Sequence, residues 1–522
     1  MRRFVRSTAL AAAGVLVTGL AAGCSSSDDG GESDGKGPSA SARGPQPKPD
    51  PSSALPASLT SQKLDWSRCK APEGGSAPGT EWQCSTLKVP LDYAKPDGER
   101  IGIALIRARS TGKGDRIGSL VFNFGGPGGS GVSGLPSFAD SYDTLRERYD
   151  LVSFDPRGVG ASEGVRCRDD RATQAAEKRV DLTPDNPAEE KAYFKDATEF
   201  GAGCARNAKK VIEHVSTADA ARDMDVMRQV LGDDKLHYFG ISYGTELGGT
   251  YAHLFPHRVG RLTFDAVVDP STDSIGHAEN QAKGFQRALD NYFRSRGQEP
   301  KAGAAKIAKL FERLDAEPMR ASGDRKLTES LASTGILVTL YSKQTWPALT
   351  SALADAEKGD GSALLQLADA YNERDPSGHY STQSHSQRAI SCLDSKARTS
   401  PEEAKKRLGR FRDISPVFGE FLGWDTAGWC HEWPVAGLYD SPEVSAPGAA
   451  PILVVGNTGD PATPYEGARK MADELGKDVG IHLTWKGEGH GAYGNGSSCV
   501  DDTIDTYLLE GKPPKDGKVC SS

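Results

Sequence analysis

A serine held between two glycines is the first candidate for chemistry in this chain. The sequence Gly-Ile-Ser-Tyr-Gly at 240–244 follows an apolar run at 236–239 and precedes a stretch with helical spacing. In a strand–turn–helix setting, the glycines allow the sharp turn that raises a serine hydroxyl above the end of a sheet. The pattern predicts acyl transfer with Ser242 as nucleophile. The alternative is a glycine-rich turn whose serine is idle.

A serine hydroxyl needs a neighbouring base, and that base needs a carboxylate to orient it. His490 follows the apolar run 481–485 and Asp460 follows the run 452–455, each in a glycine-containing turn. The carboxyl ends of parallel strands are where open α/β sheets bind ligands. We therefore expect His490 to be the general base and Asp460 to orient its imidazole. Asp269 is the main competing carboxylate, and Asp265 is another.

Backbone N–H groups should stabilise the oxyanion of the tetrahedral intermediate. One donor is expected from Tyr243, directly after the nucleophile. The other is expected from the turn Gly-Gly-Pro-Gly-Gly at 125–129, from Gly125 or Gly126, since glycine lets the backbone approach the oxyanion closely. A phosphate-binding loop is excluded because the Lys-Ser/Thr ending is absent. Neither Cys-x-x-Cys nor His-Glu-x-x-His occurs, so we expect no metal and no other cofactor.

Continuous apolar runs bounded by glycine or proline predict strands covered on both faces. They lie at 120–124, 151–154, 236–239, 262–268, 452–455 and 481–485. Helical spacing at 217–231 and 245–255 separates some of them, so we expect a mostly parallel α/β sheet with helices on both faces. The alternation stops at 271–445, where helical spacing dominates. This segment is expected to be a large helical cap inserted into a core made of 59–270 and 446–522.

The N-terminus has the features of an export signal. Arg2, Arg3 and Arg6 precede an apolar run at 8–20 that is too short to span a bilayer, and small residues then lead to Cys24. The arrangement resembles a bacterial lipobox, so 1–23 is expected to be a lipoprotein signal peptide with Cys24 acylated. An ordinary signal peptide with a chance cysteine is the alternative. The Ser-, Gly- and Pro-rich segment 24–58 is expected to be a disordered tether. These features predict attachment to the extracytoplasmic face of the bacterial cell membrane.

The chain contains nine cysteines, which are interpreted as Cys24 plus eight that pair in an exported protein. Eight cysteines allow 105 connectivities. We expect neighbours in the sequence to pair: Cys69 with Cys84, Cys167 with Cys204, Cys392 with Cys430, and Cys499 with Cys520.

Composition limits the remaining classes of function. The 522 residues are 37% hydrophobic and 26% charged, and no run approaches the roughly 20 apolar residues of a spanning helix. The net charge is −8, with Lys and Arg scattered along the chain, so nucleic acid is not an expected partner. We expect a monomer that acts on peptide substrates.

Several motifs resemble the prolyl-aminopeptidase branch of the α/β-hydrolases. They are Asn-Phe-Gly-Gly-Pro-Gly-Gly-Ser-Gly at 123–131, Asp-Pro-Arg-Gly-Val-Gly-Ala-Ser at 155–162 and Gly-Ile-Ser-Tyr-Gly-Thr at 240–245. The segments 217–223, 460–464 and 489–493, with Cys499 and Cys520, narrow the resemblance to exported tripeptidyl aminopeptidases of Gram-positive bacteria. It covers most of the chain after Trp66. It implies the α/β-hydrolase fold and a serine exopeptidase releasing short peptides, often tripeptides, from free N-termini. Phe124 stands where prolyl aminopeptidases usually have histidine, which argues against a narrow preference for N-terminal proline.

An aminopeptidase must bind a free ammonium, which in a secluded site requires carboxylates. Glu246, just past the nucleophile, is one candidate among many acidic residues, and the sequence does not choose among them. A lipid-anchored carboxylesterase with the same three catalytic residues is the alternative function. A binding lipoprotein on an inactive hydrolase scaffold is a third interpretation.

Overall fold

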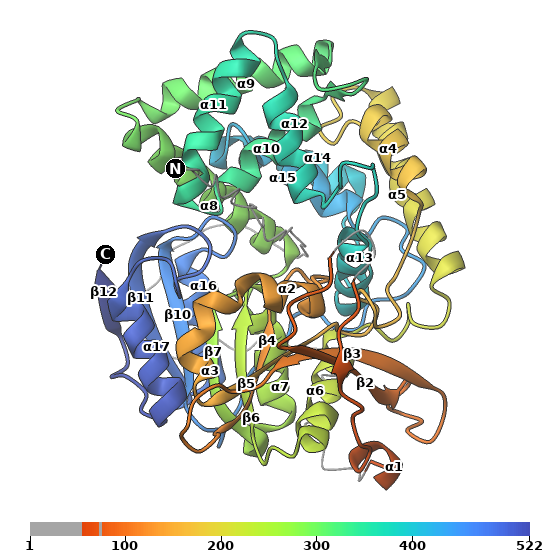
Figure 1. Ribbon diagram of the computed structural model, residues 1–522. Helices are drawn as coiled ribbons and strands as arrows, with labels where there is room; N and C mark the ends of the chain where they lie inside the picture. The colour runs from red at the N-terminus through yellow and green to blue at the C-terminus, as the bar shows by residue number, and fades with distance from the viewer. Residues whose placement is uncertain (1–54, 72–75, 522) are drawn as a thin grey trace, which may run out of the picture.

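A mixed ten-stranded sheet forms the centre of the lower lobe in Figure 1. The computed structural model describes residues 55–71 and 76–521. In spatial order the strands are β1 (Ser67–Arg68), β2 (Trp82–Pro90), β3 (Arg100–Ala108), β5 (Tyr149–Phe154), β4 (Gly118–Asn123), β6 (Leu236–Ile241), β7 (Val259–Asp265), β10 (Ile452–Gly459), β11 (Gly480–Glu488) and β12 (Lys518–Ser521). From β5 to β12 all neighbours are parallel, whereas β1, β2, β3 and β5 pair antiparallel.

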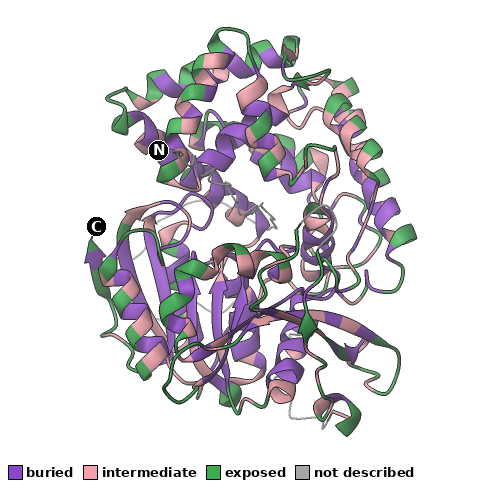
Figure 2. Ribbon diagram, viewed as in Figure 1, coloured by how far each residue is buried: buried purple, intermediate pink, exposed green. Residues whose placement is uncertain are grey.

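Successive residues of the central strands enter two different hydrophobic cores. In β10, Ile452 and Val454 belong to one core, whereas Leu453 and Val455 belong to the other. Because side chains alternate along a strand, a sheet that is apolar on both faces needs helices on both. Figure 2 shows the strands buried and the outer surfaces of the helices exposed.

The two layers of helices separate cleanly between the two cores. One layer contains α6 (Thr217–Leu231), α7 (Tyr243–Leu254) and α16 (Tyr465–Leu475). The other contains α2 (Gly131–Phe138), η1 (Ala139–Tyr142), α3 (Asp143–Arg146) and α17 (Ser498–Glu510). This is the α/β-hydrolase fold, as the resemblance implied.

The upper lobe, which we call the cap, lies between β7 and β10 in the chain (Figure 1). Its helices are α8 (Ser274–Ser295), α9 (Pro300–Ala316), α10 (Glu329–Thr339), α11 (Trp346–Glu357), α12 (Ser362–Tyr371), α13 (Gln383–Asp394), α14 (Pro401–Ile414) and α15 (Gly419–Gly428). The short strands β8 (Met319–Arg320) and β9 (Lys326–Leu327) pair within it, and η3 (Lys343–Thr345) is a single turn of it. A further single turn, η2 (Pro256–Arg258), precedes β7 and belongs to the lower lobe. Most of the cap encloses a core of its own, which also takes in Ala462 of the lower lobe.

A second excursion of the chain packs on the cap. Helices α4 (Asp170–Arg179) and α5 (Pro187–Asn207) lie along one side of the upper lobe in Figure 1. Tyr193 of α5 shares a small hydrophobic cluster with Trp424 of α15, and Glu177 of α4 forms an ion pair with Arg325. These helices lie within 59–270, the segment that we expected to form the first part of the core, and hydrophobic spacing does not reveal which lobe a helix covers.

The apolar runs predicted as strands all form strands, with different ends. The run 262–268 is strand only to Asp265, because Ala266 takes a positive φ of 53° and donates its N–H to the Asp265 carboxylate. The antiparallel strands β2 and β3 were not predicted, since their alternating burial differs from the continuous apolar runs that were sought. His385 of α13 is buried, and this burial lowers its pKa to about 3.

Four disulfides join the four pairs of neighbouring cysteines predicted from the sequence: Cys69–Cys84, Cys167–Cys204, Cys392–Cys430 and Cys499–Cys520. Such a set is typical of a protein that folds outside the cytoplasm.

The expected signal peptide, Cys24 and most of the expected tether lie outside the described residues. The short helix α1 (Ala57–Thr60) begins before the predicted end of the tether and buries Leu59. Within 55–71 and 76–521, no helix combines the length and apolar character needed to cross a membrane.

Candidate active site

Ser242 lies on a sharp turn between β6 and α7. Its backbone has φ 58° and ψ −126°, a region that non-glycine residues rarely adopt. The glycines on either side are required by crowding: a Cβ on Gly244 would lie 2.5 Å from the carbonyl oxygen of Asn123, and one on Gly240 would lie 2.4 Å from that of Gly244. The turn raises the Ser242 side chain at the carboxyl end of the sheet, where only 1% of the residue is exposed.

Asp460 and His490 are in direct contact at the same end of the sheet. Nδ1 of His490 lies 2.9 Å and 3.1 Å from the two carboxylate oxygens of Asp460. Asp460 is fully buried, and it also accepts N–H groups from Ala462 at 3.0 Å and Thr463 at 2.8 Å. Because an ionised carboxylate only accepts, Nδ1 must carry the proton, which leaves Nε2 of His490 as a proton acceptor.

The acceptor nitrogen of His490 is unused. Nε2 is buried and forms no hydrogen bond with any residue in the described part of the chain. The cap holds the imidazole from one side: Tyr341 accepts the His490 backbone N–H at 2.7 Å, and its ring packs edge-on at 5.3 Å. Catalytic hydrogen bonds commonly close only when substrate binds.

Asp265 connects the nucleophile turn to the histidine loop. Its backbone oxygen accepts the N–H of Ser242 at 3.1 Å. Its carboxylate accepts the N–H groups of Ala492, at 2.9 Å from Oδ2, and of Tyr493, at 3.0 Å. Burial raises the pKa of this carboxyl, and the three backbone donors, which include Ala266, oppose the shift. Asp265 is therefore a positioning residue rather than the partner of His490.

Asp269, the main competing carboxylate, is engaged elsewhere. Its Oδ2 forms an ion pair with Lys470 at 3.0 Å. Its Oδ1 accepts hydrogen bonds from the hydroxyl and the N–H of Ser271 at 2.7 Å and 2.9 Å.

The sequence did not predict one residue that lies near the histidine: the Thr463 hydroxyl is 3.3 Å from Nδ1 of His490. Its place three residues after Asp460 is the only sequence signal for it.

The two glycines predicted for the oxyanion hole have different roles. The Gly125 N–H is already donated to Oδ1 of Asn123 at 3.0 Å, so we correct its expected role as a donor. Gly125 instead permits close approach: it has φ 93°, and a Cβ there would lie 2.8 Å from Cβ of Ser242. Gly126 lines the cavity beside Ser242 and Tyr243. No hydrogen bond within the described chain uses the N–H of Gly126 or of Tyr243.

The Asp-Pro-Arg-Gly motif builds structure rather than chemistry. All five N–H donors of the buried Arg157 are used: two bind Asp223 at 2.7 and 2.8 Å, and three bind backbone carbonyls of residues 90, 91 and 214 at 2.9–3.0 Å. Asp155 caps the turn into α2 by accepting the Ser130 hydroxyl at 2.7 Å. Phe124, at the position of the usual histidine, packs on Phe138 at 5.2 Å.

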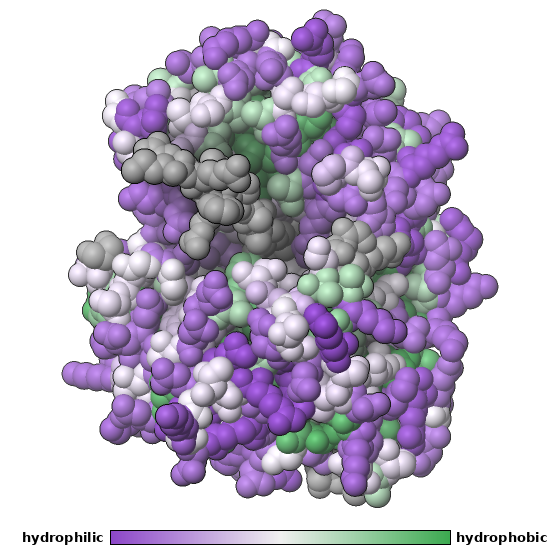
Figure 3. All heavy atoms as spheres, in the orientation of Figure 1, coloured by the Kyte–Doolittle hydropathy of each residue, from purple (hydrophilic) through white to green (hydrophobic). Residues whose placement is uncertain are grey.

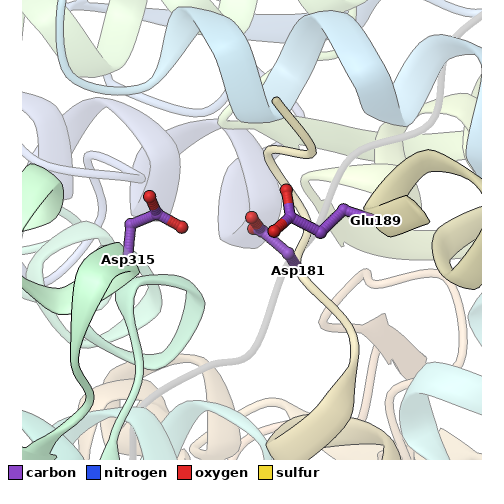
Figure 4. Close-up of side chains that lie close together, drawn as sticks. All are labelled: Asp181, Glu189 and Asp315. Carbon is purple, nitrogen blue, oxygen red and sulfur yellow. The ribbon is translucent and has the colours of Figure 1, made fainter. Parts of the chain in front are cut away.

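One group of acidic side chains lies far from the nucleophile. Asp181, Glu189 and Asp315 bring carboxylate oxygens within 4.8 Å of one another at the junction of α5 and α9 (Figure 4). Asp181 accepts bonds from Thr183, and Glu189 accepts the N–H of Asp185. Partly exposed carboxylates of this kind are common without an ion, and no cofactor role is assigned to them.

A family model described as TAP-like protein matches residues 415–520, the segment that carries Asp460 and His490. The serine protease Hip1 of Mycobacterium tuberculosis is 37% identical over 482 residues, covering 88% of this chain and 91% of that protein. The chain belongs to the TAP-like serine peptidase family.

Two further members show the range of the TAP-like family. The tripeptidyl aminopeptidase of Streptomyces lividans is 31% identical over 490 residues, covering 88% of this chain and 86% of that protein. A protein of Mycobacterium tuberculosis named carboxylesterase B is 34% identical over 483 residues, covering 89% and 91%. As a member of this family, the protein is a serine hydrolase.

Proposed function

We propose that this protein is a surface-anchored serine exopeptidase that removes short peptides, chiefly tripeptides, from free N-termini. The observation that carries the proposal is the buried Asp460–His490 pair, at the same end of the sheet as the Ser242 turn. The 31% identity to a tripeptidyl aminopeptidase supports the choice of substrate. The lipobox-like sequence ending at Cys24 supports anchoring.

The proposed mechanism gives each side chain a role. Ser242 Oγ attacks the scissile carbonyl while Nε2 of His490 takes its proton, and Asp460 holds the imidazole in the Nδ1–H tautomer. The N–H groups of Tyr243 and Gly126 stabilise the oxyanion. The imidazolium then protonates the leaving amine, and water activated by the same imidazole releases the peptide from the acyl-enzyme.

A lipid-anchored carboxylesterase is the second candidate, because one relative is named carboxylesterase B. The triad does not distinguish the two, since both reactions transfer an acyl group to serine. The deciding experiment compares kcat/KM for a tripeptidyl anilide, its N-acetylated form and a short acyl ester. We expect the free tripeptide to be the best substrate. Equal rates on free and blocked peptides would remove the exopeptidase claim, and a dominant ester activity would favour the esterase.

Labelling by a fluorophosphonate probe tests the nucleophile separately. The wild-type protein should be labelled and the Ser242→Ala variant should not, with a loss of hydrolysis of about 10⁴-fold or more. Labelling that persists in Ser242→Ala would assign the nucleophile elsewhere. No labelling of the wild type would favour a binding protein on an inactive scaffold.

A further inference from the structure

The cavity that contains Ser242 is lined by negative side chains. It encloses about 1160 Å³, part of it open to solvent, and runs along α7 between the cap and the core. Six carboxylates line it: Glu246, Asp269, Asp273, Asp394, Asp440 and Glu443. No lysine or arginine within residues 55–71 and 76–521 lines this cavity. A cleft lined by one sign of charge attracts ligands of the opposite sign.

Four of these carboxylates have structural partners. Asp269 binds Lys470, and Asp440 binds Lys396 at 3.3 Å. Asp273 caps α8 by accepting the Gly276 N–H at 2.7 Å, and Glu443 accepts the Ser445 N–H at 3.1 Å. These contacts account for their positions without a ligand.

Glu246 has no such explanation. It lies in the first turn of α7, four residues beyond the nucleophile, which corresponds to roughly 6 Å of helical rise. Within the described chain, no hydrogen bond or ion pair reaches its carboxylate. Burial, and secondarily the charge of Asp394, raise its pKa to about 8. A carboxyl in this setting either keeps its proton or is stabilised as a carboxylate by a neighbouring cation.

Asp394 approaches from the cap. It is the last residue of α13. Its carboxylate accepts two hydrogen bonds from Thr217, one from the backbone N–H at 2.9 Å and one from the side-chain hydroxyl at 2.6 Å. Both donors are uncharged, so the negative charge stays uncompensated, and burial raises the pKa of this carboxyl to about 7. Thr217 Oγ1 also lies 2.6 Å from the Tyr243 hydroxyl, which ties Asp394 to the residue after the nucleophile.

Besides Nε2 of His253, two buried polar atoms in the wall of the cavity lack partners in the described structure. The hydroxyl of Ser274, a residue only 4% exposed, forms no hydrogen bond in the described structure. Oε1 of Gln281, a residue 2% exposed, is likewise unpaired, although its Nε2 donates to the carbonyl of Ala462. Buried polar atoms without partners are rare in proteins. A polar ligand such as a peptide backbone would satisfy both.

We propose that the N-terminal ammonium of the substrate binds between Glu246 of α7 and Asp394 of α13, with the scissile carbonyl at Ser242. The inference rests on the proposed exopeptidase function and gives it a physical basis. One anchor for the amine and one for the carbonyl fix the length of peptide that reacts. Since Glu246 belongs to the core and Asp394 to the cap, productive binding requires both lobes in place.

The test measures kcat/KM for free and N-acetylated tripeptidyl anilides in Glu246→Gln and Asp394→Asn. Each variant keeps the shape of the side chain and removes its charge. We expect kcat/KM for the free substrate to fall about 10- to 100-fold, mainly through KM, with little change for the acetylated one. Asp440→Asn, which loses a carboxylate of the same cavity paired with Lys396, is the matched control and should leave the preference unchanged.

Labelling of Ser242 by the fluorophosphonate reports whether each variant still folds with an intact nucleophile. If the wild type prefers free peptides and both labelled variants keep that preference, the amine site is wrong while the exopeptidase function stands. If the wild type itself shows no preference, the proposed function fails first.

A binding measurement covers the case in which the variants do not fold. Calorimetry on the Ser242→Ala protein should give at least tenfold tighter binding for a free tripeptide than for its acetylated form. Equal affinities would overturn the amine site.

Discussion

At the scale of residues, the site depends on which carboxylate meets the imidazole. Three aspartates end or follow neighbouring strands, and each has a different set of partners. Asp460 faces Nδ1 of His490, Asp265 accepts backbone N–H groups of the histidine loop, and Asp269 binds Lys470. Only the first arrangement fixes a histidine tautomer.

Asp460→Asn should therefore lower kcat by about 10⁴-fold, because an amide at this position favours the tautomer in which Nδ1 is the acceptor. Steady-state kinetics on the free tripeptidyl anilide measure the effect. Asp269→Asn, which weakens only the contact with Lys470, should keep kcat within about threefold. A larger loss in Asp269→Asn than in Asp460→Asn would exchange the two assignments.

At the scale of elements, close backbone contacts between loops and helices hold the site together. The 125–129 turn lies against the nucleophile turn at Gly125 and against α13 of the cap at Gly128, where a Cβ would lie 2.5 Å from the carbonyl oxygen of Gln383. Helix α8 holds the loop of Asp460 through the Arg287 guanidinium, 3.2 Å from the Asp460 carbonyl oxygen. A side chain added at these contacts must move a loop.

Gly125→Ala should reduce kcat/KM by at least 100-fold, since its Cβ would lie 2.7 Å from the carbonyl oxygen of Ile241 and would displace the oxyanion loop. The matched control is Gly232→Ala, which also has a positive φ but has nothing within 4 Å of its Cβ. It should lower stability by about 1 kcal/mol without affecting catalysis. Kinetics and thermal melts on both variants separate these effects. Normal activity in Gly125→Ala would show that the loop tolerates the displacement.

At the scale of the whole molecule, most of the cap has a hydrophobic core of its own, whereas its helix α13 packs into the core that contains α6 and α7. The active site lies at the junction of the cap and the core. The cap has its own core, and α4 and α5 add a second layer to it. Figure 3 shows the surface hollowed between the two lobes, with hydrophobic residues in the wall of the upper one. Ionisable groups are buried at this junction and elsewhere in the cap, so global stability depends on pH.

We predict that the free energy of unfolding falls between pH 6.5 and pH 8. Burial raises the pKa of Glu246 to about 8 and those of Asp394, Asp425 and Glu329 to about 7. These carboxyls are ionised in the unfolded chain above about pH 5, so the folded state binds more protons and loses stability as the pH rises. The loss is at most about 1.4 kcal/mol per pH unit for each group.

Buried histidines act only below this window. The pKa values of His237 and His277 fall to about 4, which lowers stability below about pH 6.5, where the unfolded chain binds the protons. Denaturant unfolding at pH 6.5 and pH 8 measures the difference. Glu246→Gln should reduce it, whereas Asp440→Asn should not. A stability that rises from pH 6.5 to pH 8 would contradict the burial of these carboxyls.

The sequence by itself determined the parallel strands, the nucleophile turn and the disulfide pairs. Each of these depends on residues that are close together in the sequence: an apolar run, two glycines that flank a serine, or two neighbouring cysteines. The sequence also predicted an aspartate and a histidine in the turns after the last two long strands. Because these strands are parallel, the turns that follow them lie at the same end of the sheet.

Only the tertiary structure decided between candidate residues that have the same local sequence context. Asp460 and Asp269 both follow strands, and the difference is that Lys470 of α16 reaches one of them. Gly125 and Gly126 are adjacent, and only the Asn123 side chain shows that the first N–H is occupied. Glu246 becomes distinctive when α13, about 150 residues later in the chain, brings Asp394 to the same cavity. Such contacts join segments that are far apart in the chain, so the local spacing of residues does not predict them.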